Sequence, residues 1–579
     1  MTSRPVPKAN SRDVHCAGTR SAVAEWQVNA VIAGLGATPR EDGAAVPDGG
    51  RGRVPRARLR ALLPPGLLVT VWLVVLLAHL RVPAPSDQLN YLLAARRFPD
   101  PVAEGTETHQ LTRFGLIVPA ALAVKVFGYS QAAYAAVPVL ATLSLLAGTY
   151  ALGTLLFSRT VGAAAGVAVV AATPVFDDST DLLPDVLAIG LFTCALALAV
   201  AVRRRDRPPG VWVLVGIGAL LGWSYMTREF IVFLWPVIPV LLYRRAGLAG
   251  LAWIAAPIAM LAVTELLLCW RLYGDPLARL LAVTGHGSGP SRPEIAATYR
   301  DKPRMVYVQR LPDTLMRFYP EGRLLVWLIV ATLLGAPAWP RRLALPAALL
   351  VLFWVPLTLL GGVLDPSAPK LRLQLIRYWI PVFPAFVLGG LAALWLLASA
   401  LSRRLPGRAR VALPAVAVVA AAAVVSGVAA RGWWAGPQTR AGGATQMEAF
   451  RTWMHDRDGT YRRLWTDPDT RRILAVYRNG PFGGQAWRGE IHTYRRHGGA
   501  GPAPGDLVVF YDTERGEVCP YCKAEARRTW GDTSGNRPGW HQVFATPDRV
   551  LRVFEVAPSS SPPEVAGDAA PGAKTRADS

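Results

Sequence analysis

The feature that most constrains the fold is a series of long apolar segments joined by short loops rich in arginine. Each segment approaches the ~20 residues that a helix needs to cross a bilayer. Since a helix satisfies its own backbone hydrogen bonds in lipid, the pattern predicts an α-helical polytopic membrane protein. We predict about eleven spans, at residues 62–80, 132–157, 160–176, 184–202, 211–225, 230–243, 247–271, 323–339, 343–362, 378–401 and 411–430.

Composition agrees with this class of protein, since 52% of the 579 residues are apolar and only 17% are charged. The net charge of +23 would suggest nucleic acid in a soluble chain. Here the arginines gather in short loops between apolar segments, as membrane topology requires. We therefore predict that the chain lies in a lipid bilayer and does not bind nucleic acid.

Residues 114–128 decide the topology. They are apolar, but they number only 15 and contain Pro119 and Lys125, so we interpret them as a helix in the membrane interface. With a cytoplasmic N-terminus, the arginine clusters of the short loops then fall on the cytoplasmic side. These clusters lie at 159, 203–207, 244–245, 341–342 and 403–410.

The predicted organisation is a disordered cytoplasmic arm, a transmembrane domain, an extracytoplasmic α/β domain and a disordered tail. Strands of the α/β domain are expected at 472–477, 507–511 and 550–556. The four parts span residues 1–60, 61–430, 431–556 and 557–579, and the main outer loops are 81–131, 177–183 and 272–322.

Asp87 follows the first apolar segment directly and begins a short helical stretch, Asp87–Phe98. A carboxylate at the boundary of water and lipid can act as a general base. Tyr91 lies one turn later on the same face. The alternative is that Asp87, with Ser86, only caps the helix.

A second acidic cluster stands between two predicted spans, on the same side as Asp87. It contains Asp177, Asp178 and Asp181, and Asp185 enters the following apolar segment directly after Pro184. A charge placed in a span is unfavourable and usually functional. The first three carboxylates could equally be a solvated loop.

Basic residues on the outer side run against the usual charge bias and call for an explanation. They are His109, Arg113, Arg228 and Arg377, the last followed by Tyr378. Guanidinium groups bind phosphate in bidentate fashion, so a lipid phosphate is one explanation. Snorkelling, or pairing with the acidic loops, is the other.

Two further features remain open. The loop 272–322 contains a glycine-rich stretch at 285–289 that could cover a substrate or be a plain surface loop. Cys519 and Cys522 form a Cys-Pro-Tyr-Cys motif, for which a local disulfide is favoured over redox activity.

The order of these features resembles the polyprenyl-phosphate-dependent glycosyltransferases of the C type (GT-C), in particular bacterial relatives of the protein O-mannosyltransferases and the aminoarabinose transferases (family 39-like). The resemblance covers about residues 62–400. It rests on Asp87-Gln88-Leu89-Asn90-Tyr91, Phe127-Gly128, Leu183-Pro184-Asp185, Thr227-Arg228-Glu229 and Arg377-Tyr378-Trp379-Ile380-Pro381. Gln88 departs from the family, where many members have Glu.

The resemblance implies a cell-membrane enzyme that transfers a sugar, with inversion, from a polyprenyl-phosphate donor to a protein, lipid or polysaccharide hydroxyl. It implies catalytic roles for Asp87, as base, and Asp185. Substrate-binding roles fall to Tyr91, His109, Arg113, Asp177, Asp178, Arg228, Arg377 and Tyr378. It implies no certain cofactor and no metal ligand, although a divalent cation is left open.

Two other functions compete with this one. A polytopic transporter or lipid flippase of the cell envelope would explain the spans and the charges within them, but the sequence has no visible repeat. A non-catalytic scaffold or sensor of envelope assembly is the third class.

Overall fold

The computed structural model describes most of the chain, and everything below concerns the residues that it describes. These are 56–79, 87–100, 108–285, 297–435, 444–457, 459–468, 470–471, 474, 489–494, 501–511, 520–531, 535 and 537–558.

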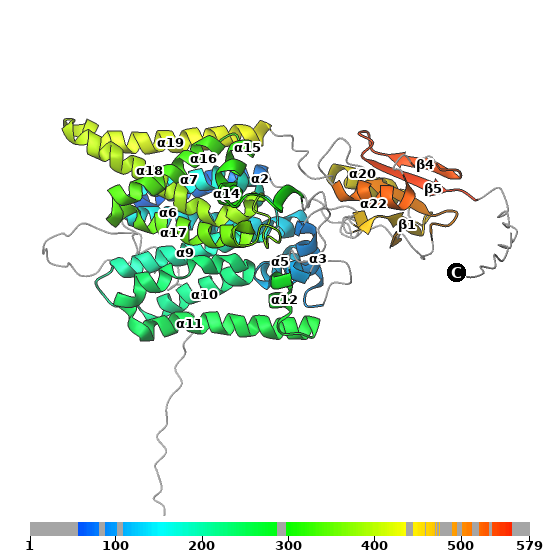
Figure 1. Ribbon diagram of the computed structural model, residues 1–579, viewed down its shortest axis with the longest axis horizontal. Coiled ribbons are helices and arrows are strands. Elements are labelled where there is room, and N and C mark those ends of the chain that lie inside the picture. Colours follow the sequence, from blue (N-terminus) through cyan, green and yellow to red (C-terminus); the bar gives the residue numbers. More distant parts are fainter. Residues whose placement is uncertain are drawn as a thin grey trace, which may run out of the picture. The chain divides into compact units, whose positions relative to one another are not determined.

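The first part of the chain is entirely helical (Figure 1). Its elements are α2 (Arg56–Ala78), α3 (Asp87–Arg97), α4 (Thr108–Leu111), α5 (Phe114–Phe127), α6 (Gln131–Leu156), α7 (Arg159–Ala171), α8 (Thr173–Ser179), α9 (Pro184–Arg204), α10 (Val211–Thr227), η1 (Glu229–Leu234), α11 (Val237–Tyr273), α12 (Ala278–Gly285), α14 (Arg304–Val308), α15 (Arg310–Phe318), α16 (Gly322–Ala338), α17 (Pro340–Thr358), η2 (Leu359–Val363), η3 (Ile376–Val382), α18 (Phe383–Leu401), η4 (Ser402–Arg404) and α19 (Gly407–Ala435).

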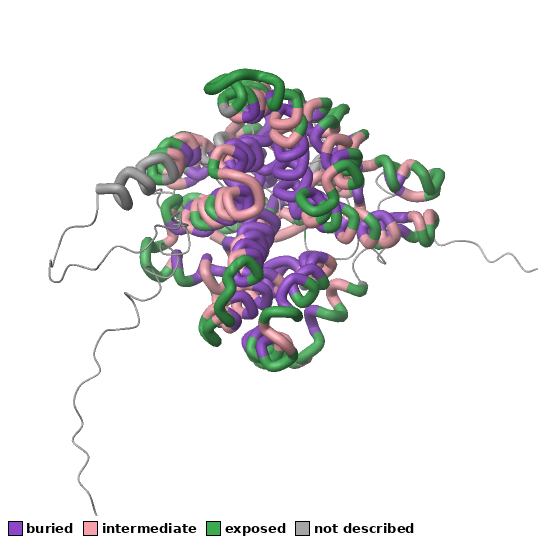
Figure 2. Tube along the Cα trace, turned by 90° about the vertical axis from the view of Figure 1, so that its left-hand side faces the viewer, coloured by how far each residue is buried: buried purple, intermediate pink, exposed green. Residues whose placement is uncertain are grey.

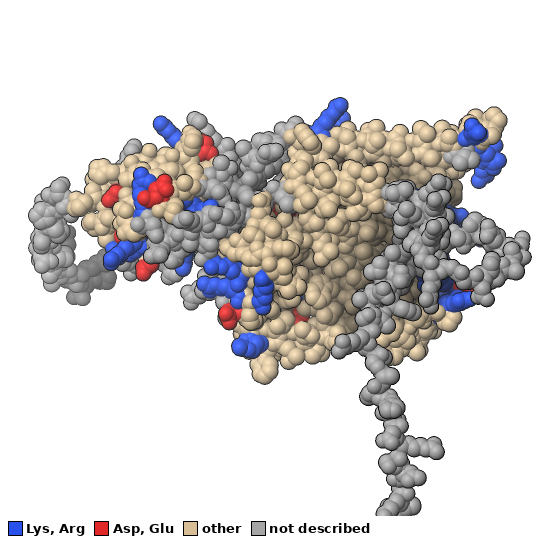
Figure 3. All heavy atoms as spheres, turned by 180° about the vertical axis from the view of Figure 1, so that it is seen from behind, with Lys and Arg blue, Asp and Glu red and all other residues tan. Residues whose placement is uncertain are grey.

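Six of the described helices are long and apolar enough to cross a membrane, and α7 with α8, bent by 69°, makes a seventh candidate. Four shorter apolar helices accompany them: Gly66–Ala78, Phe114–Phe127, Val211–Thr227 and Gly322–Ala338. On the face shown in Figure 3, most charged side chains of this helical part lie toward its ends, and residues other than Lys, Arg, Asp and Glu cover most of its middle. The predicted class, a polytopic α-helical membrane protein, is confirmed. Six or seven of the described segments meet the length criterion, and the count of about eleven spans stays a prediction.

The helix α11 explains part of this difference. Its second half runs parallel to α10, because residues pair in the same order along both: Leu214 with Gly250, Gly218 with Ile254, and Gly222 with Ile258. Residues 228–246 must therefore return to the end where α10 begins. Gly247, with φ of 62°, breaks the helix at the reversal, since glycine tolerates this conformation. The geometry agrees with separate segments at 230–243 and 247–271.

The helix α5 coincides with the predicted interfacial helix. Its 14 residues give a length of about 21 Å, less than the ~30 Å hydrocarbon core. One side of it is buried in the protein, and Leu122, Val126 and Phe127 are exposed. Its depth relative to a membrane stays a prediction.

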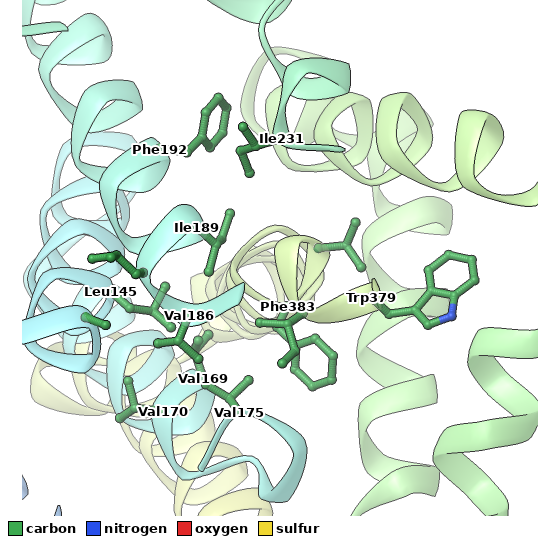
Figure 4. Close-up of a cluster of buried hydrophobic side chains, with 14 of the residues drawn as sticks. Leu145, Val169, Val170, Val175, Val186, Ile189, Phe192, Ile231, Trp379 and Phe383 are labelled. Carbon is green, nitrogen blue, oxygen red and sulfur yellow. The ribbon is translucent and has the colours of Figure 1, made fainter. Parts of the chain in front are cut away.

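The core of the helical part contains buried residues of α6, α7, α8, α9, η1, η3 and α18. Buried segments lie at the centre of the view in Figure 2. Figure 4 shows its side chains interdigitating across these elements: Leu145, Val169, Val170, Val175, Val186, Ile189, Phe192, Ile231, Trp379 and Phe383. Trp379 is fully buried. The core therefore fixes η3, which carries two of the predicted site residues.

The C-terminal part is an α/β domain with a five-stranded sheet in the order β2-β1-β3-β5-β4. The pairs β1–β2 and β1–β3 are parallel, while β3–β5 and β4–β5 are antiparallel. The elements are α20 (Ala444–His455), β1 (Arg463–Thr466), β2 (Glu490–Thr493), β3 (Leu507–Tyr511), α22 (Pro520–Trp530), β4 (Trp540–Ala545) and β5 (Leu551–Val556).

The mixed α/β character of this domain was predicted, and so were β3 and β5. The strand expected at 472–477 falls mostly outside the described residues, and the described positions 471 and 474 are helical. Cys519 also lies outside the described residues. Cys522 lies in the first turn of α22, but its side chain is not described.

Candidate active site

The charged residues predicted from sequence converge from five separate stretches of the helical part. Each stretch lies at a helix end or in a short element, and the helices packed around it fix its position. They are the start of α3, the residue before α5, the pair α8–α9, the turn between α10 and η1, and η3.

Asp87 is held by side chains from two distant elements. Gln110 Nε2 donates a hydrogen bond of 2.7 Å to Asp87 Oδ1, and Arg377 forms an ion pair with Oδ2. Asn90 donates to the Gln110 side-chain oxygen, so the amide is itself oriented. The side chains of Asp87 and Arg377 are 16% and 28% exposed. A helix cap would not require these partners, and the carboxylate stays within reach of solvent.

Arg228 and Asp185 form a second ion pair, and this one is sealed from solvent. Arg228 Nε lies 3.0 Å from Asp185 Oδ1, and the two side chains are 2% and 1% exposed. The guanidinium carbon lies 5.0 Å from the Tyr378 ring centroid and 5.4 Å from that of Phe230. Arg228 Nη2 and both Asp185 oxygens nevertheless lack a hydrogen-bond partner. The two side chains thus meet through one electrostatic contact, and the remaining N–H groups of Arg228 and the oxygens of Asp185 can still form hydrogen bonds with a ligand.

The short helix α8 brings further carboxylates to the same place. Asp178 is buried, its Oδ2 has no hydrogen-bond partner, and it interacts electrostatically with Asp185 and Arg377. Asp177 is half-buried on the same helix. The first turn of α8 is fixed by Glu321, whose Oε1 accepts a 2.7 Å hydrogen bond from Thr173 N.

A chain of alternating charges supports the site from the side of α11. Arg113 Nη2 and Arg279 Nη2 each lie 3.5 Å from a carboxylate oxygen of Glu229, and Arg279 Nη1 lies 2.5 Å from Glu265 Oε2. Burial alone would raise the pKa of Glu229, but the guanidiniums of Arg113, Arg228 and Arg279 hold it well below its usual range. Glu229 is therefore ionised and fixes the turn that carries Arg228.

Tyr91 joins this chain to the helix of Asp87. Arg113 Nη1 donates a hydrogen bond to the Tyr91 hydroxyl oxygen, and the guanidinium carbon lies 5.9 Å from the ring centroid. Burial raises the pKa of Tyr91 to about 12. The hydroxyl therefore stays neutral at physiological pH.

The structure thus brings eight of the ten predicted site residues into one connected group: Asp87, Tyr91, Arg113, Asp178, Asp185, Arg228, Arg377 and Tyr378. Asp177 lies beside this group on α8. His109 falls in α4, but its side chain is outside the described residues, as is most of the glycine-rich stretch 285–289.

The sequence reasoning missed Gln110, Glu265 and Arg279 and gave Glu229 no role. Glu265 carried a signal, since it stands within the apolar segment 247–271, where an ionisable residue is usually functional. Gln110 and Arg279 lie in polar stretches that offered no such contrast.

The described residues contain no group of three or more His, Cys, Asp or Glu side chains that could hold a metal ion. The site offers carboxylates as proton acceptors and guanidiniums as ligands for an anion. Such a site can abstract a hydroxyl proton and stabilise a departing phosphate.

Comparison with known proteins places this site in a known fold. No family model and no curated protein sequence matches the chain. Among solved structures, it is similar to GT-C membrane glycosyltransferases, the class that the sequence resembles, and the expected fold is thereby confirmed.

The particular structure that carries this argument is the aminoarabinose transferase ArnT from Cupriavidus metallidurans, solved with undecaprenyl phosphate. The TM-score is 0.51 and the identity 15%, over 86% of this chain and 99% of ArnT. The apo form of ArnT gives a TM-score of 0.47 at 15% identity, over 73% and 86%. The oligosaccharyltransferase AglB from Archaeoglobus fulgidus, in complex with an inhibitory peptide and a dolichol-phosphate, gives 0.42 at 12%, over 71% and 63%.

Proposed function

We propose that the protein is a membrane glycosyltransferase that transfers a sugar from a polyprenyl-phosphate donor to an acceptor hydroxyl at the outer face of the membrane. The observation that carries the proposal is the position of Asp87. Its carboxylate lies at the accessible edge of a buried group of arginines and is oriented by Gln110 and Arg377. The GT-C fold and the apolar helices support a donor that enters from the bilayer.

The reaction requires a base and an anion ligand on opposite sides of the sugar. The acceptor oxygen forms a bond to the anomeric carbon, the bond from that carbon to the phosphate oxygen breaks, and the phosphate leaves with the electron pair. The acceptor proton passes to Asp87. Attack from the side opposite the phosphate inverts the anomeric configuration.

Arg377 links the two halves of this reaction. In the structure its guanidinium pairs with Asp87. The phosphate of a donor competes for the same guanidinium, because arginine binds phosphate with two parallel hydrogen bonds. Transfer of Arg377 to the phosphate would release one oxygen of Asp87 to accept the acceptor proton.

Arg228 and Arg113 have donors in reserve for the same phosphate. Arg228 Nη2 and Arg113 Nε are buried without hydrogen-bond partners. Buried unpaired donors are uncommon, and a ligand anion would satisfy them. Asp185 positions Arg228, and its unpaired oxygens are available to sugar or acceptor hydroxyls. Of the other residues proposed to bind substrate, Tyr91 and Tyr378 pack against Arg113 and Arg228, whereas Asp177, Asp178 and His109 follow from the sequence resemblance.

The test is transfer by the purified full-length protein from radiolabelled polyprenyl-phosphate mannose to candidate acceptors. Removing a general base lowers the rate by about 10²–10⁴-fold, so Asp87→Asn should lose activity on that scale. Asp313→Asn is the matched control, because Asp313 is an exposed carboxylate on α15. Equal transfer by wild type and Asp87→Asn would refute the role of Asp87, and transfer by neither with a range of lipid-phosphate sugars would refute the proposed activity.

A further inference from the structure

Two arginines share one aromatic ring on a surface that the proposed reaction does not use. Arg372 and Arg300 have their guanidinium carbons 5.4 Å and 5.9 Å from the centroid of the Tyr299 ring. Tyr299 is almost fully buried, and both arginines are half-buried. The ring is therefore a fixed support that both cations contact.

Within the part of the chain that the structure describes, neither arginine has a counter-charge. Among the described residues, no carboxylate forms an ion pair with Arg300 or Arg372, and no carbonyl accepts a hydrogen bond from either guanidinium. Arg300 Nε is buried without a hydrogen-bond partner. Two like charges held together without compensation repel each other, and an unsatisfied buried donor is unfavourable. This arrangement indicates a ligand that supplies negative charge.

The backbone around the pair is well fixed. Tyr307 donates its hydroxyl hydrogen to the Tyr299 carbonyl at 2.8 Å, and that hydroxyl oxygen accepts a hydrogen bond from Lys302 N at 3.2 Å. Asp301 adopts a positive φ of 54° and donates its N–H to Pro366 O at 2.8 Å. These bonds tie the segment of Arg300 to the segment that leads to Arg372. The pair is thus held in place rather than carried on free side chains.

The same segment continues into the candidate active site. Leu371 and Leu373 are buried, while Arg372 and Gln374 are half-buried. Gln374 Nε2 donates to Thr298 Oγ1 at 3.3 Å, and Gln374 Oε1 is buried without a partner. Arg377 follows three residues later. A ligand bound at the pair would therefore lie beside the site.

We propose that Tyr299, Arg300, Arg372 and Gln374 form an anion-binding site for a phosphate group. The two guanidiniums bind the phosphate oxygens, and the Gln374 side-chain oxygen accepts a hydrogen bond from a hydroxyl next to that phosphate. A membrane phospholipid headgroup and a soluble phosphate ester share this chemistry, and the experiment separates them.

The first measurement is equilibrium dialysis of the full-length protein, in nanodiscs of neutral phosphatidylcholine, against ³²P-labelled inorganic phosphate at constant ionic strength. The variant Arg300→Gln/Arg372→Gln should lose one saturable binding site, or bind there at least tenfold more weakly. Arg228→Gln should retain that site, which separates it from the proposed active site. Arg372→Lys keeps the charge and should retain measurable binding, which guards against a folding defect.

The second measurement counts phosphatidylglycerol molecules retained by the protein in native mass spectrometry. Arg317→Gln is the matched control in both measurements, because Arg317 is an exposed arginine 5.3 Å from the Phe318 ring. Loss of phosphate binding alone identifies a soluble phosphate ester, and loss of lipid retention identifies a headgroup. Equal binding of both probes by wild type and the double variant overturns the proposal. Neither measurement needs sugar transfer, so the outcome is independent of the proposed enzyme activity.

Discussion

The buried pair of Arg228 and Asp185 gives the sharpest test of the site as an electrostatic unit. Both side chains are at most 2% exposed, and they meet through one contact of 3.0 Å. Removing one partner leaves the other charge buried and unpaired, which costs about 3–5 kcal/mol, whereas replacing both with apolar residues is often close to neutral. Asp185→Leu should therefore destabilise by this amount.

The variant Arg228→Met should lower the free energy of unfolding by more than Asp185→Leu does. Arg228→Met also loses two ring contacts, to Tyr378 and Phe230, each worth about 0.5–2 kcal/mol. The double variant keeps that loss but has no unpaired charge. We therefore expect the double variant to be more stable than either single variant, with a coupling energy of about 6–10 kcal/mol, because each single variant leaves one charge unpaired and the double variant leaves none.

The assay is reversible unfolding in mixed micelles, monitored by tryptophan fluorescence, on all four proteins of the cycle. Asp313→Leu and Arg317→Met form the control cycle, because these exposed residues stand four apart on α15. Such a pair contributes only about 0.2–0.5 kcal/mol. If the Arg228–Asp185 cycle gave a coupling as small as the control, the buried pair would not be the electrostatic unit described here.

Three further outcomes follow from the structure. Glu265→Leu should cost about 1.5–3 kcal/mol in the same unfolding assay, because it removes the shorter of the two carboxylate contacts of Arg279 while Glu229 keeps the other. Burial raises the pKa of Tyr91 from 10.0 to about 12. The contribution of its neutral hydroxyl to the free energy of unfolding is therefore complete below pH 10 and is lost as the pH rises toward 12. Unfolding measured as a function of pH should show this loss in wild type and not in Tyr91→Phe. Gly218→Ala should lower the free energy of unfolding by about 1–3 kcal/mol, because the added Cβ would overlap a backbone carbonyl of α11. The control Gly216→Ala, which has open space around it, should be neutral or stabilising. Equal effects of the two variants would contradict the parallel packing of α10 and α11.

The sequence by itself determined the membrane class and most of the helices. Apolar length and arginine loops are local signals, because the bilayer imposes its thickness on each segment separately. The sequence also pointed to Asp87 and Asp185, since a carboxylate beside an apolar segment contrasts with its neighbours. The GT-C fold inferred from the order of such features is confirmed by the likeness to ArnT.

The tertiary structure alone decided which charges meet. That Arg377 pairs with Asp87, 290 positions earlier in the chain, depends on how η3 packs in the core, and no local pattern encodes such a distance. The sequence could not indicate a role for Gln110 or Arg279 for the same reason, because the role of a polar residue in a polar stretch depends on the partner that it contacts in the folded protein.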